Sequence, residues 1–293
     1  MSNPASAVAT RQGRYYQLDL PPVLADRAPH VKRSGDTIWL PSVTNVLDSM
    51  SKPGLMWWAA GEVATEVFTD PDRIATMVAA AHNGRTITGF HPCEACRQPT
   101  DHYLESKGKW FHTACYDRWR TLRKVFNDQR IQKADLGSLV HDLVEKHILG
   151  NPVDPADYPP EVAGRVEAWQ RFVTKHEPSF ELAEATVFNL THGYAGTLDI
   201  IMDVGGHRWL VDVKSGTPTV YESHALQLAA YRYAEHVYVG AGVVEALPEV
   251  DRCAILFLGE DRFKFEPVDV ADGDLVEGFL PLLTFQRWQT ARA

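Results

Sequence analysis

The sequence has no apolar run that approaches the length needed to cross a membrane. Its beginning, MSNPASAVATRQGRYY, also lacks the apolar centre of a secretory signal peptide. These absences argue against an integral membrane protein and against a secreted one. No internal repeat points to a solenoid. We therefore expect a soluble, cytoplasmic protein with no membrane partner.

Positive charge is in short supply as well. Lys and Arg number 29 against 38 Asp and Glu, which gives a formal net charge of -9. A generally basic nucleic-acid binder is thereby disfavoured, so any affinity for DNA must come from local patches and from bound metal. The 45% of hydrophobic residues can fill a substantial core in one large or two modest domains.

Cysteine is scarce, with four in 293 residues, and in an intracellular chain this favours metal ligands or reduced thiols over disulfides. A C-x2-C pair is followed after fifteen residues by H-x2-C, which is the spacing of a closed, tetrahedral structural zinc site. The expected ligands are Cys93, Cys96, His112 and Cys115. This segment resembles half of a LIM-type or treble-clef finger. The alternatives are buried free cysteines, or His91 or His102 in place of His112. Cys253 lies in the apolar run CAILFL and is interpreted as a core residue.

What the sequence does contain is an acidic hairpin over residues 196–216, GTLDIIMDVGGHRWLVDVKSG. Both arms alternate at period two around Gly205-Gly206, a pair that suits the positive φ angles of a tight turn. If Val204 faces His207, counting outward places Asp199 opposite Asp212. Directly opposed like charges are destabilising unless a cation lies between them.

Lys214 points to the same face as both aspartates, because strand side chains alternate. Carboxylate oxygens suit Mg²⁺, which lowers the pKa of its bound water and offsets charge on a phosphate, and the ammonium group can assist. Asp199, Asp212 and Lys214 therefore suit metal-dependent hydrolysis of a phosphodiester. The alternative is an ordinary solvated strand face with a surface salt bridge.

Three segments, GTLDI, VDVKSG and QLAAY, resemble the PD-(D/E)XK nuclease superfamily, and more narrowly its RecB-like exonuclease branch with its phage-encoded relatives. The resemblance implies a restriction-endonuclease-like α/β fold, a mixed sheet flanked by helices, and Mg²⁺- or Mn²⁺-dependent cleavage of DNA. By the same resemblance Asp199 and Asp212 are metal ligands, the carbonyl of Val213 is a further ligand, and Lys214 is the catalytic lysine.

The resemblance also assigns roles outside the hairpin. Gln227 and Tyr231 match the Q-x-x-x-Y element of that branch and share a helix face. His141, in an amphipathic helix expected over residues 134–149, corresponds to a metal-binding histidine. Glu184 stands where related nucleases often carry a glutamate. The alternatives are a satisfied, partly buried histidine, a surface acid at Glu184 and simple packing of Tyr231 under the sheet.

The densest basic run follows the expected finger and comprises Arg118, Arg120, Arg123, Lys124, Arg130 and Lys133. On a helix these side chains can follow DNA phosphates, so the finger and this helix together form a candidate DNA-guiding insertion. A solvated helix face is the alternative.

The remaining periodicity supports an α/β architecture. We expect an N-terminal segment over residues 1–88, a zinc-binding insertion over 89–119 and the nuclease core over 120–293. Strands are expected near residues 15–20, 37–40, 180–190, 252–259 and 262–268. Helices are expected after Ser42 and over residues 55–68, 161–176, 220–239 and 275–292.

The site favours metal-dependent hydrolysis, and the resemblance implies a DNA exonuclease of phage or bacterial recombination, repair or replication. A single-strand annealing protein or a helicase is a possible partner. The alternatives are a non-catalytic DNA-binding module of the same fold and a site-directed endonuclease.

Overall fold

The computed structural model describes residues 7–10, 13–27, 32–50, 91–92, 99–100, 103–106, 109–112, 132–240, 243–260 and 262–292. The chain divides into two compact units. One combines Met1–Ser51 with Leu136–Ala293, and the other is Lys52–Asp135.

Apart from the helical residues 132–135, the described part of the second unit consists of short antiparallel strands. β5 (His91–Pro92) pairs with β6 (Pro99–Thr100), and β7 (Tyr103–Ser106) pairs with β8 (Lys109–His112). His112 is the last residue of β8 and lies opposite Tyr103. The three expected cysteine ligands, the basic residues 118–130 and the helix expected over 55–68 lie outside the described residues, so these expectations stay predictions.

A large mixed sheet forms the centre of the first unit. Its strands are β9 (Ser179–Asn189), β10 (Tyr194–Val204), β11 (His207–Lys214), β12 (His236–Gly240), β13 (Val243–Ala246), β14 (Arg252–Leu258) and β15 (Phe263–Val268). Among the described residues their order is β13-β12-β9-β10-β11-β14-β15. Only the β11–β14 pairing within this sheet is parallel. The mixed α/β fold expected from the sequence is confirmed.

The central hairpin has the register that was counted from the sequence. Val204 pairs with His207, and the ladder of β10 and β11 continues to Ile200 opposite Val211. Gly205 and Gly206 form the turn with φ angles of 63° and 78°, a region that residues with a Cβ rarely adopt. The turn chemistry therefore fixes which side chains share a face.

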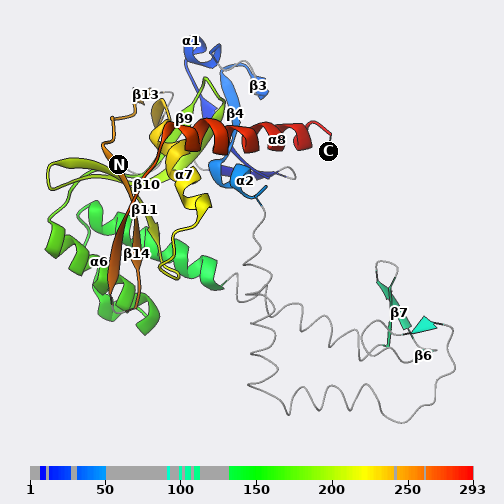
Figure 1. Ribbon diagram of the computed structural model, residues 1–293, viewed down its shortest axis with the longest axis horizontal. Coiled ribbons are helices and arrows are strands. Elements are labelled where there is room, and N and C mark those ends of the chain that lie inside the picture. The colour runs from blue at the N-terminus through cyan, green and yellow to red at the C-terminus, as the bar shows by residue number, and fades with distance from the viewer. Residues whose placement is uncertain are drawn as a thin grey trace. The chain divides into compact units, whose positions relative to one another are not determined.

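Helices cover both faces of this sheet. α6 (Pro160–His176) and a helix over residues 132–148 pack on one face, where Trp169 and Phe172 are buried against Val211 and Val213. The other face is covered by α2 (Val43–Leu47), α7 (Glu222–Arg232), the π-helix η2 (Asp274–Phe279) and α8 (Leu280–Thr290). Figure 1 shows α2, α7 and α8 grouped together, with α6 apart from them.

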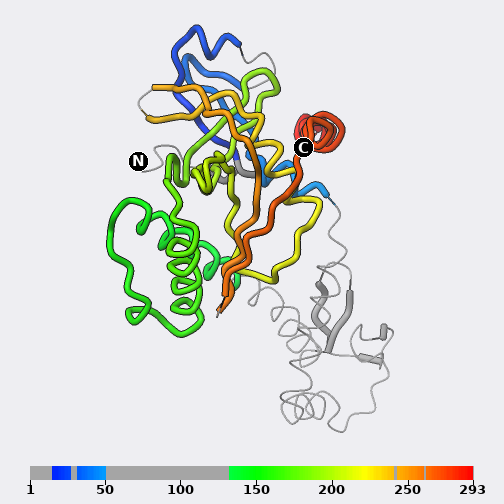
Figure 2. Tube along the Cα trace, turned by 60° about the vertical axis from the view of Figure 1, so that its left-hand side comes forward, coloured from blue at the N-terminus to red at the C-terminus, as the bar shows by residue number. Residues whose placement is uncertain are grey.

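A smaller sheet is built from the N-terminal segment. Its described strands run in the order β1 (Ala7–Thr10), β2 (Gly13–Asp19), β4 (Thr37–Pro41) and β3 (Lys32–Ser34), with α1 (Pro22–Ala25) after β2. Figure 2 shows this blue segment and the green residues 132–176 at opposite ends of the large sheet. A bridge between Ser42 and Ala195 joins the segment to β10. Ser42 also caps α2, as expected, by accepting a hydrogen bond from the backbone N–H of Asn45.

One expected element is wrong. The helix expected over residues 220–239 ends at Arg232, and residues 236–240 form strand β12. This segment, HVYVG, is rich in β-branched and aromatic residues, and it pairs with β9 on one side and β13 on the other. Sheet pairing therefore decides its conformation.

The short 3₁₀ helix η1 (Pro155–Asp157) interrupts the proline-rich loop before α6. Among the described helices, none combines the length and apolar character required to cross a membrane.

Candidate metal centre

The candidate site lies where β9, β10 and β11 run side by side, on the face of the sheet that α2 and α7 cover. Asp199 on β10 is its central residue. Its Oδ2 accepts a hydrogen bond from the backbone N–H of Val213 at 2.6 Å and lies 3.6 Å from Nδ1 of His141. The carboxylate is nearly buried, with 9% of the residue exposed.

Asp212 and Lys214 face the same side of the sheet as Asp199, as expected. Nζ of Lys214 donates to Oδ1 of Asp212 at 2.9 Å and lies 2.7 Å from Oδ2. That Oδ2 is buried and has no hydrogen bond of acceptable geometry. The paired strand ladder ends at Ile200 and Val211, one step before the two aspartates.

Glu184 brings a third carboxylate from β9. Ala185 pairs with Leu198, and Ala183 pairs with Ile200. Glu184 therefore lies across from Asp199, although these two residues do not themselves form a β-bridge pair. Glu184 has a φ of 45°, an uncommon value for a residue with a side chain. Its Oε1 lies 3.1 Å from Nδ1 of His141. A strained backbone conformation thus accompanies the placement of this carboxylate at the site.

His141 lies on the helix over residues 132–148, which packs on the other face of the sheet from α7. Its Nδ1 faces Glu184, and its Nε2 lies 3.0 Å from the carbonyl oxygen of Val213. Gly137 lies one turn earlier, where a Cβ would make an ordinary contact of 3.5 Å with Oγ of Ser215, so the close approach does not require glycine there. The helix therefore places an imidazole directly beside the acidic groups.

The electrostatics of the site reflect crowding of acids in a buried place. Burial raises the pKa of Asp199 to about 7, and the neighbouring carboxylates of Asp212 and Glu184 add to this while His141 opposes it. Burial alone would lower the pKa of His141, but Asp199 and Glu184 outweigh it and raise that pKa to about 9. Burial likewise opposes the charge on Lys214, yet Asp212 and Asp199 raise its pKa, so the ammonium group stays charged.

The donor set fits a hard divalent cation. Ligand atoms of His141, Glu184 and Asp199 all lie within 4.8 Å of one another. Oxygen donors dominate the surroundings, with a buried Asp212 oxygen that lacks a hydrogen bond and the Val213 carbonyl close by. Mg²⁺ and Mn²⁺ prefer such ligands.

A cavity of about 310 Å³ opens beside these groups. Gln227 and Tyr231 line it from α7, and the amide of Gln227 lies 3.5 Å from the hydroxyl of Tyr231. The full lining comprises Tyr16, Ser42, Val43, Thr44, His141, Glu184, Gly196, Thr197, Asp199, Asp212, Lys214, Gln227 and Tyr231. All the residues expected from the sequence near the metal site are thus brought together, with Val213 contributing backbone groups.

Four polar residues of this lining, Tyr16, Ser42, Thr44 and Thr197, were not predicted as site residues. Thr197 adjoins the aspartate motif, and the capping role of Ser42 could be read from the sequence. No local signal marks Tyr16, because its position depends on how the N-terminal sheet packs.

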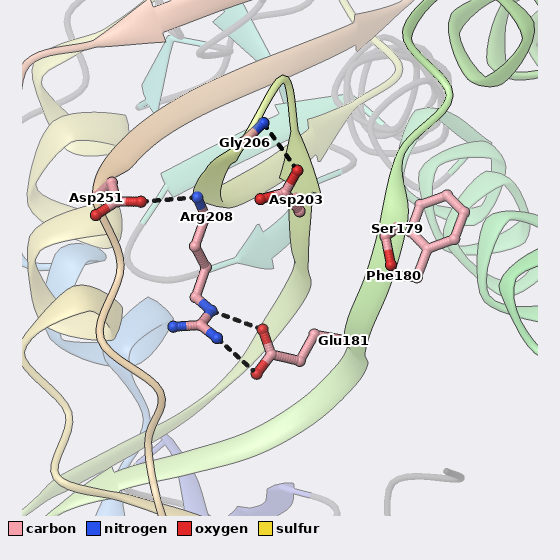
Figure 3. A pocket seen from close by; sticks show the side chains of 7 residues that line it. All are labelled: Ser179, Phe180, Glu181, Asp203, Gly206, Arg208 and Asp251. Atoms are coloured by element: carbon pink, nitrogen blue, oxygen red, sulfur yellow. Dashed lines mark hydrogen bonds and ion pairs between the residues drawn. The ribbon is translucent and has the colours of Figure 1, made fainter.

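A second hollow, of about 380 Å³, lies at the turn of the same hairpin (Figure 3). There the guanidinium of Arg208 pairs with Glu181 at 2.7 Å, and its backbone N–H donates to Asp251 at 2.9 Å. The backbone N–H of Gly206 donates to Asp203 at 3.0 Å. The acids of this hollow are engaged by cationic or backbone donors, so it fastens the turn to neighbouring segments.

Comparison with known proteins agrees with this geometry. A family model described as the PD-(D/E)XK nuclease superfamily matches residues 100–272. No significant match was found among curated proteins. A solved structure titled "Crystal structure of SSO0001" is 13% identical, with 43% of this chain and 57% of that chain covered and a TM-score of 0.26. That likeness is too weak to carry an argument.

Proposed function

The chain belongs to the PD-(D/E)XK nuclease superfamily, and from this premise we propose that it is a Mg²⁺- or Mn²⁺-dependent deoxyribonuclease, acting as an exonuclease. The observation that carries the proposal is the convergence of Glu184 with the buried Asp199 and Asp212 on one cavity that Lys214 also lines. Such a concentration of buried negative charge is costly unless a cation is bound there.

In this proposal Glu184, Asp199, Asp212, the Val213 carbonyl and His141 would hold the cation. When bound, it would lower the pKa of an attacking water and offset the charge that develops on the phosphate. Lys214 lies close enough to Asp212 to share the site, and its ammonium group donates to a phosphate oxygen or orients the water. Asp199, anchored by the Val213 N–H, fixes the position of the carboxylates. To serve as a ligand, His141 would have to lose a proton and one of its contacts, those of Nδ1 to Glu184 and of Nε2 to the Val213 carbonyl.

The decisive experiment compares end-labelled linear DNA with covalently closed circular DNA in Mg²⁺, Mn²⁺ or EDTA. Asp212→Ala and Lys214→Ala test the site, and Asp203→Ala is the matched control, because Asp203 lies on β10 at the turn. Metal-dependent loss of linear DNA alone, abolished by both site variants and retained by the control, supports the exonuclease. Defined cuts in the circle would instead establish an endonuclease. DNA binding without cleavage in either metal would leave a non-catalytic binding module.

The proposal extends to the second unit. Cys93, Cys96, His112 and Cys115 would hold a structural zinc ion, and Arg118, Arg120, Arg123, Lys124 and Arg130 would follow the DNA backbone. Metal analysis tests the first point: wild type should carry one zinc ion per chain, and Cys93→Ser should carry none. Weaker DNA binding by Arg120→Glu with unchanged zinc content would test the second.

The biological setting remains part of the proposal. The RecB-like, phage-type motifs suggest a role in recombination, repair or replication in the cytoplasm of a bacterium or of an infected host. A single-strand annealing protein or a helicase would be a fitting partner. The test is co-purification of either protein with the tagged chain from its native cell, before and after digestion of the DNA. A partner lost on digestion is associated through DNA, and a partner that is retained binds the protein directly.

A further inference from the structure

The cavity lining comprises two sets of residues of different chemistry, each called a wall below. One carries the carboxylates, His141 and Lys214. The other carries neutral groups able to donate hydrogen bonds, which are Tyr16, Ser42, Thr44, Thr197, Gln227 and Tyr231. The cation site explains the first wall but gives no reason for the second.

Tyr16 reaches the second wall from a different sheet. It lies on β2, and its hydroxyl forms a 2.7 Å hydrogen bond with Oγ1 of Thr197 on β10. The Ser42–Ala195 bridge joins the same two parts of the chain independently. The ring of Tyr16 is buried among Leu18, Leu40 and other apolar side chains, with 6% of the residue exposed. Its ring cannot stack on a base, whereas its hydroxyl lines the cavity.

Tyr231 brings a second phenol to the same wall. Gly196 makes this possible, because a Cβ at that position would lie 2.4 Å from Cε1 of Tyr231 and 3.1 Å from its hydroxyl. Burial raises the pKa of Tyr231 well above its usual value, and the nearby Tyr16 and Asp199 add to the effect. The phenol therefore remains a protonated donor at any pH at which the protein would work.

We propose that the hydroxyl groups of Tyr16 and Thr197, with Tyr231, form a neutral subsite that binds non-bridging phosphate oxygens of the DNA strand held in the cavity. The proposal rests on the proposed nuclease function. A phosphodiester has acceptors and no donors, so it needs O–H or N–H partners; within the Tyr16–Thr197 pair one hydroxyl donates to the other, so the pair offers at most one proton to a phosphate. A base edge presents a mixed pattern of donors and acceptors and would need a mixed set of partners.

The absence of positive charge from this wall has a physical reason. A lysine or arginine placed there would pair with Asp199 or Glu184 and compete with the divalent cation for them. Hydroxyl donors bind a phosphate oxygen without neutralising the carboxylates. The wall thus positions the strand while the acidic side keeps its affinity for metal.

The first test compares Tyr16→Phe with Tyr15→Phe. Tyr15 is the neighbouring residue of β2, and its hydroxyl accepts a hydrogen bond from Gln286 on α8 instead of lining the cavity. We expect Tyr16→Phe to raise KM for linear DNA roughly ten- to hundredfold, as for a lost hydrogen bond to a charged group, with melting temperature and Mg²⁺ affinity close to those of Tyr15→Phe. Tyr15→Phe should keep the wild-type KM.

The second test identifies the bound group. Single methylphosphonates, which replace one charged phosphate oxygen by a methyl group, are scanned along the labelled strand. At one position the wild type should lose affinity, and Tyr16→Phe should lose no more there, because the two changes remove the same contact. Additive losses at every position would overturn the subsite.

The nuclease and the subsite fail differently. If wild type cuts no DNA in Mg²⁺ or Mn²⁺, the nuclease proposal itself is refuted. If wild type cuts and Tyr16→Phe matches it in KM, only the subsite is refuted. Should Tyr16→Phe fail to fold, Thr197→Val serves in its place with Thr197→Ser as its hydroxyl-retaining control, and equal KM values for these two would count against the subsite.

Discussion

The two ends of the β10–β11 hairpin place acids in opposite situations. At the turn, Glu181 pairs with Arg208, and Asp203 and Asp251 accept backbone N–H groups (Figure 3). At the other end Asp199 and Asp212 share a buried spot with Glu184, and the pKa of Asp199 is raised to about 7. One end satisfies its charges locally, whereas the other holds charge in excess. The comparison teaches that position within a single hairpin decides whether an aspartate is paired with nearby donors or adds to a local excess of negative charge.

The largest expected difference is between Asp199→Asn and Asp203→Asn. Both changes keep an oxygen that can accept the existing backbone hydrogen bond. Asp199→Asn removes a charge from the cation site and should lower the cleavage rate about 100-fold or more, while Asp203→Asn should leave it unchanged. Initial rates in Mg²⁺ measure both. Equal rates for the two variants would erase the distinction between the ends.

The pH dependence of stability should show the same contrast without metal. The folded-state pKa values of Asp199 and His141 lie above their ordinary values, so the folded protein binds more protons than the unfolded chain. Stability should therefore fall as pH rises, between about 4 and 7 through Asp199 and between about 6.5 and 9 through His141, by several kcal/mol in total at about 1.4 kcal/mol per pKa unit. Urea unfolding in EDTA at pH 5, 7 and 9 measures the slope.

Two variants make that measurement specific. Asp199→Asn should flatten the slope below pH 7, and Glu181→Gln, at the turn, should leave it as in wild type. Saturating Mg²⁺ should also flatten it, since the cation binds the deprotonated groups. A slope that survives Asp199→Asn would place its origin elsewhere in the chain.

Features of the fold and the site could be predicted from the sequence where they depend on neighbouring residues, and were missed where they depend on contacts between distant positions. The period-two pattern and the glycine pair were enough to fix the register of the hairpin and hence the grouping of Asp199 with Asp212. His141 and Glu184 were predicted through the family resemblance, because nothing local tells a ligand from a satisfied histidine. Tyr16 was missed since its role depends on contact with Thr197, 181 positions away. Strand β12 was missed because pairing with β9 and β13 outweighs the continuation of a helix.

Replacing a glycine by alanine at each end of the hairpin compares how tightly the two ends are packed. Gly196→Ala would drive a Cβ to 2.4 Å from Tyr231, so the ring must shift, and we expect a loss of about 1–3 kcal/mol together with impaired cleavage. Gly206→Ala meets no atom within 4 Å, yet it forces a residue with a side chain to a φ of 78°. That strain should cost about 1 kcal/mol and spare cleavage. Thermal unfolding with rate measurements on the same samples distinguishes the two effects.

The smallest effect is expected from the ion pair at the turn. Arg208 and Glu181 are each about two-fifths exposed, at 41% and 38% of their side chains. Replacing Glu181 by Gln should cost roughly 0.2–1 kcal/mol, less at high salt, with no change in cleavage. Chemical unfolding at low and high ionic strength checks this. A loss of activity would show that the turn influences the distant end of the hairpin.

The hydrogen bond between Tyr16 and Thr197 also bears on the order of events during synthesis. Thr197 leaves the ribosome 181 residues after Tyr16. At translation rates of about 5 to 20 residues per second, that interval is roughly 10 to 40 s. Asp212 and Lys214 emerge later still. The nascent chain thus carries β2 through that interval before Tyr16 can meet Thr197, and the candidate site stays incomplete until Asp212 and Lys214 have emerged.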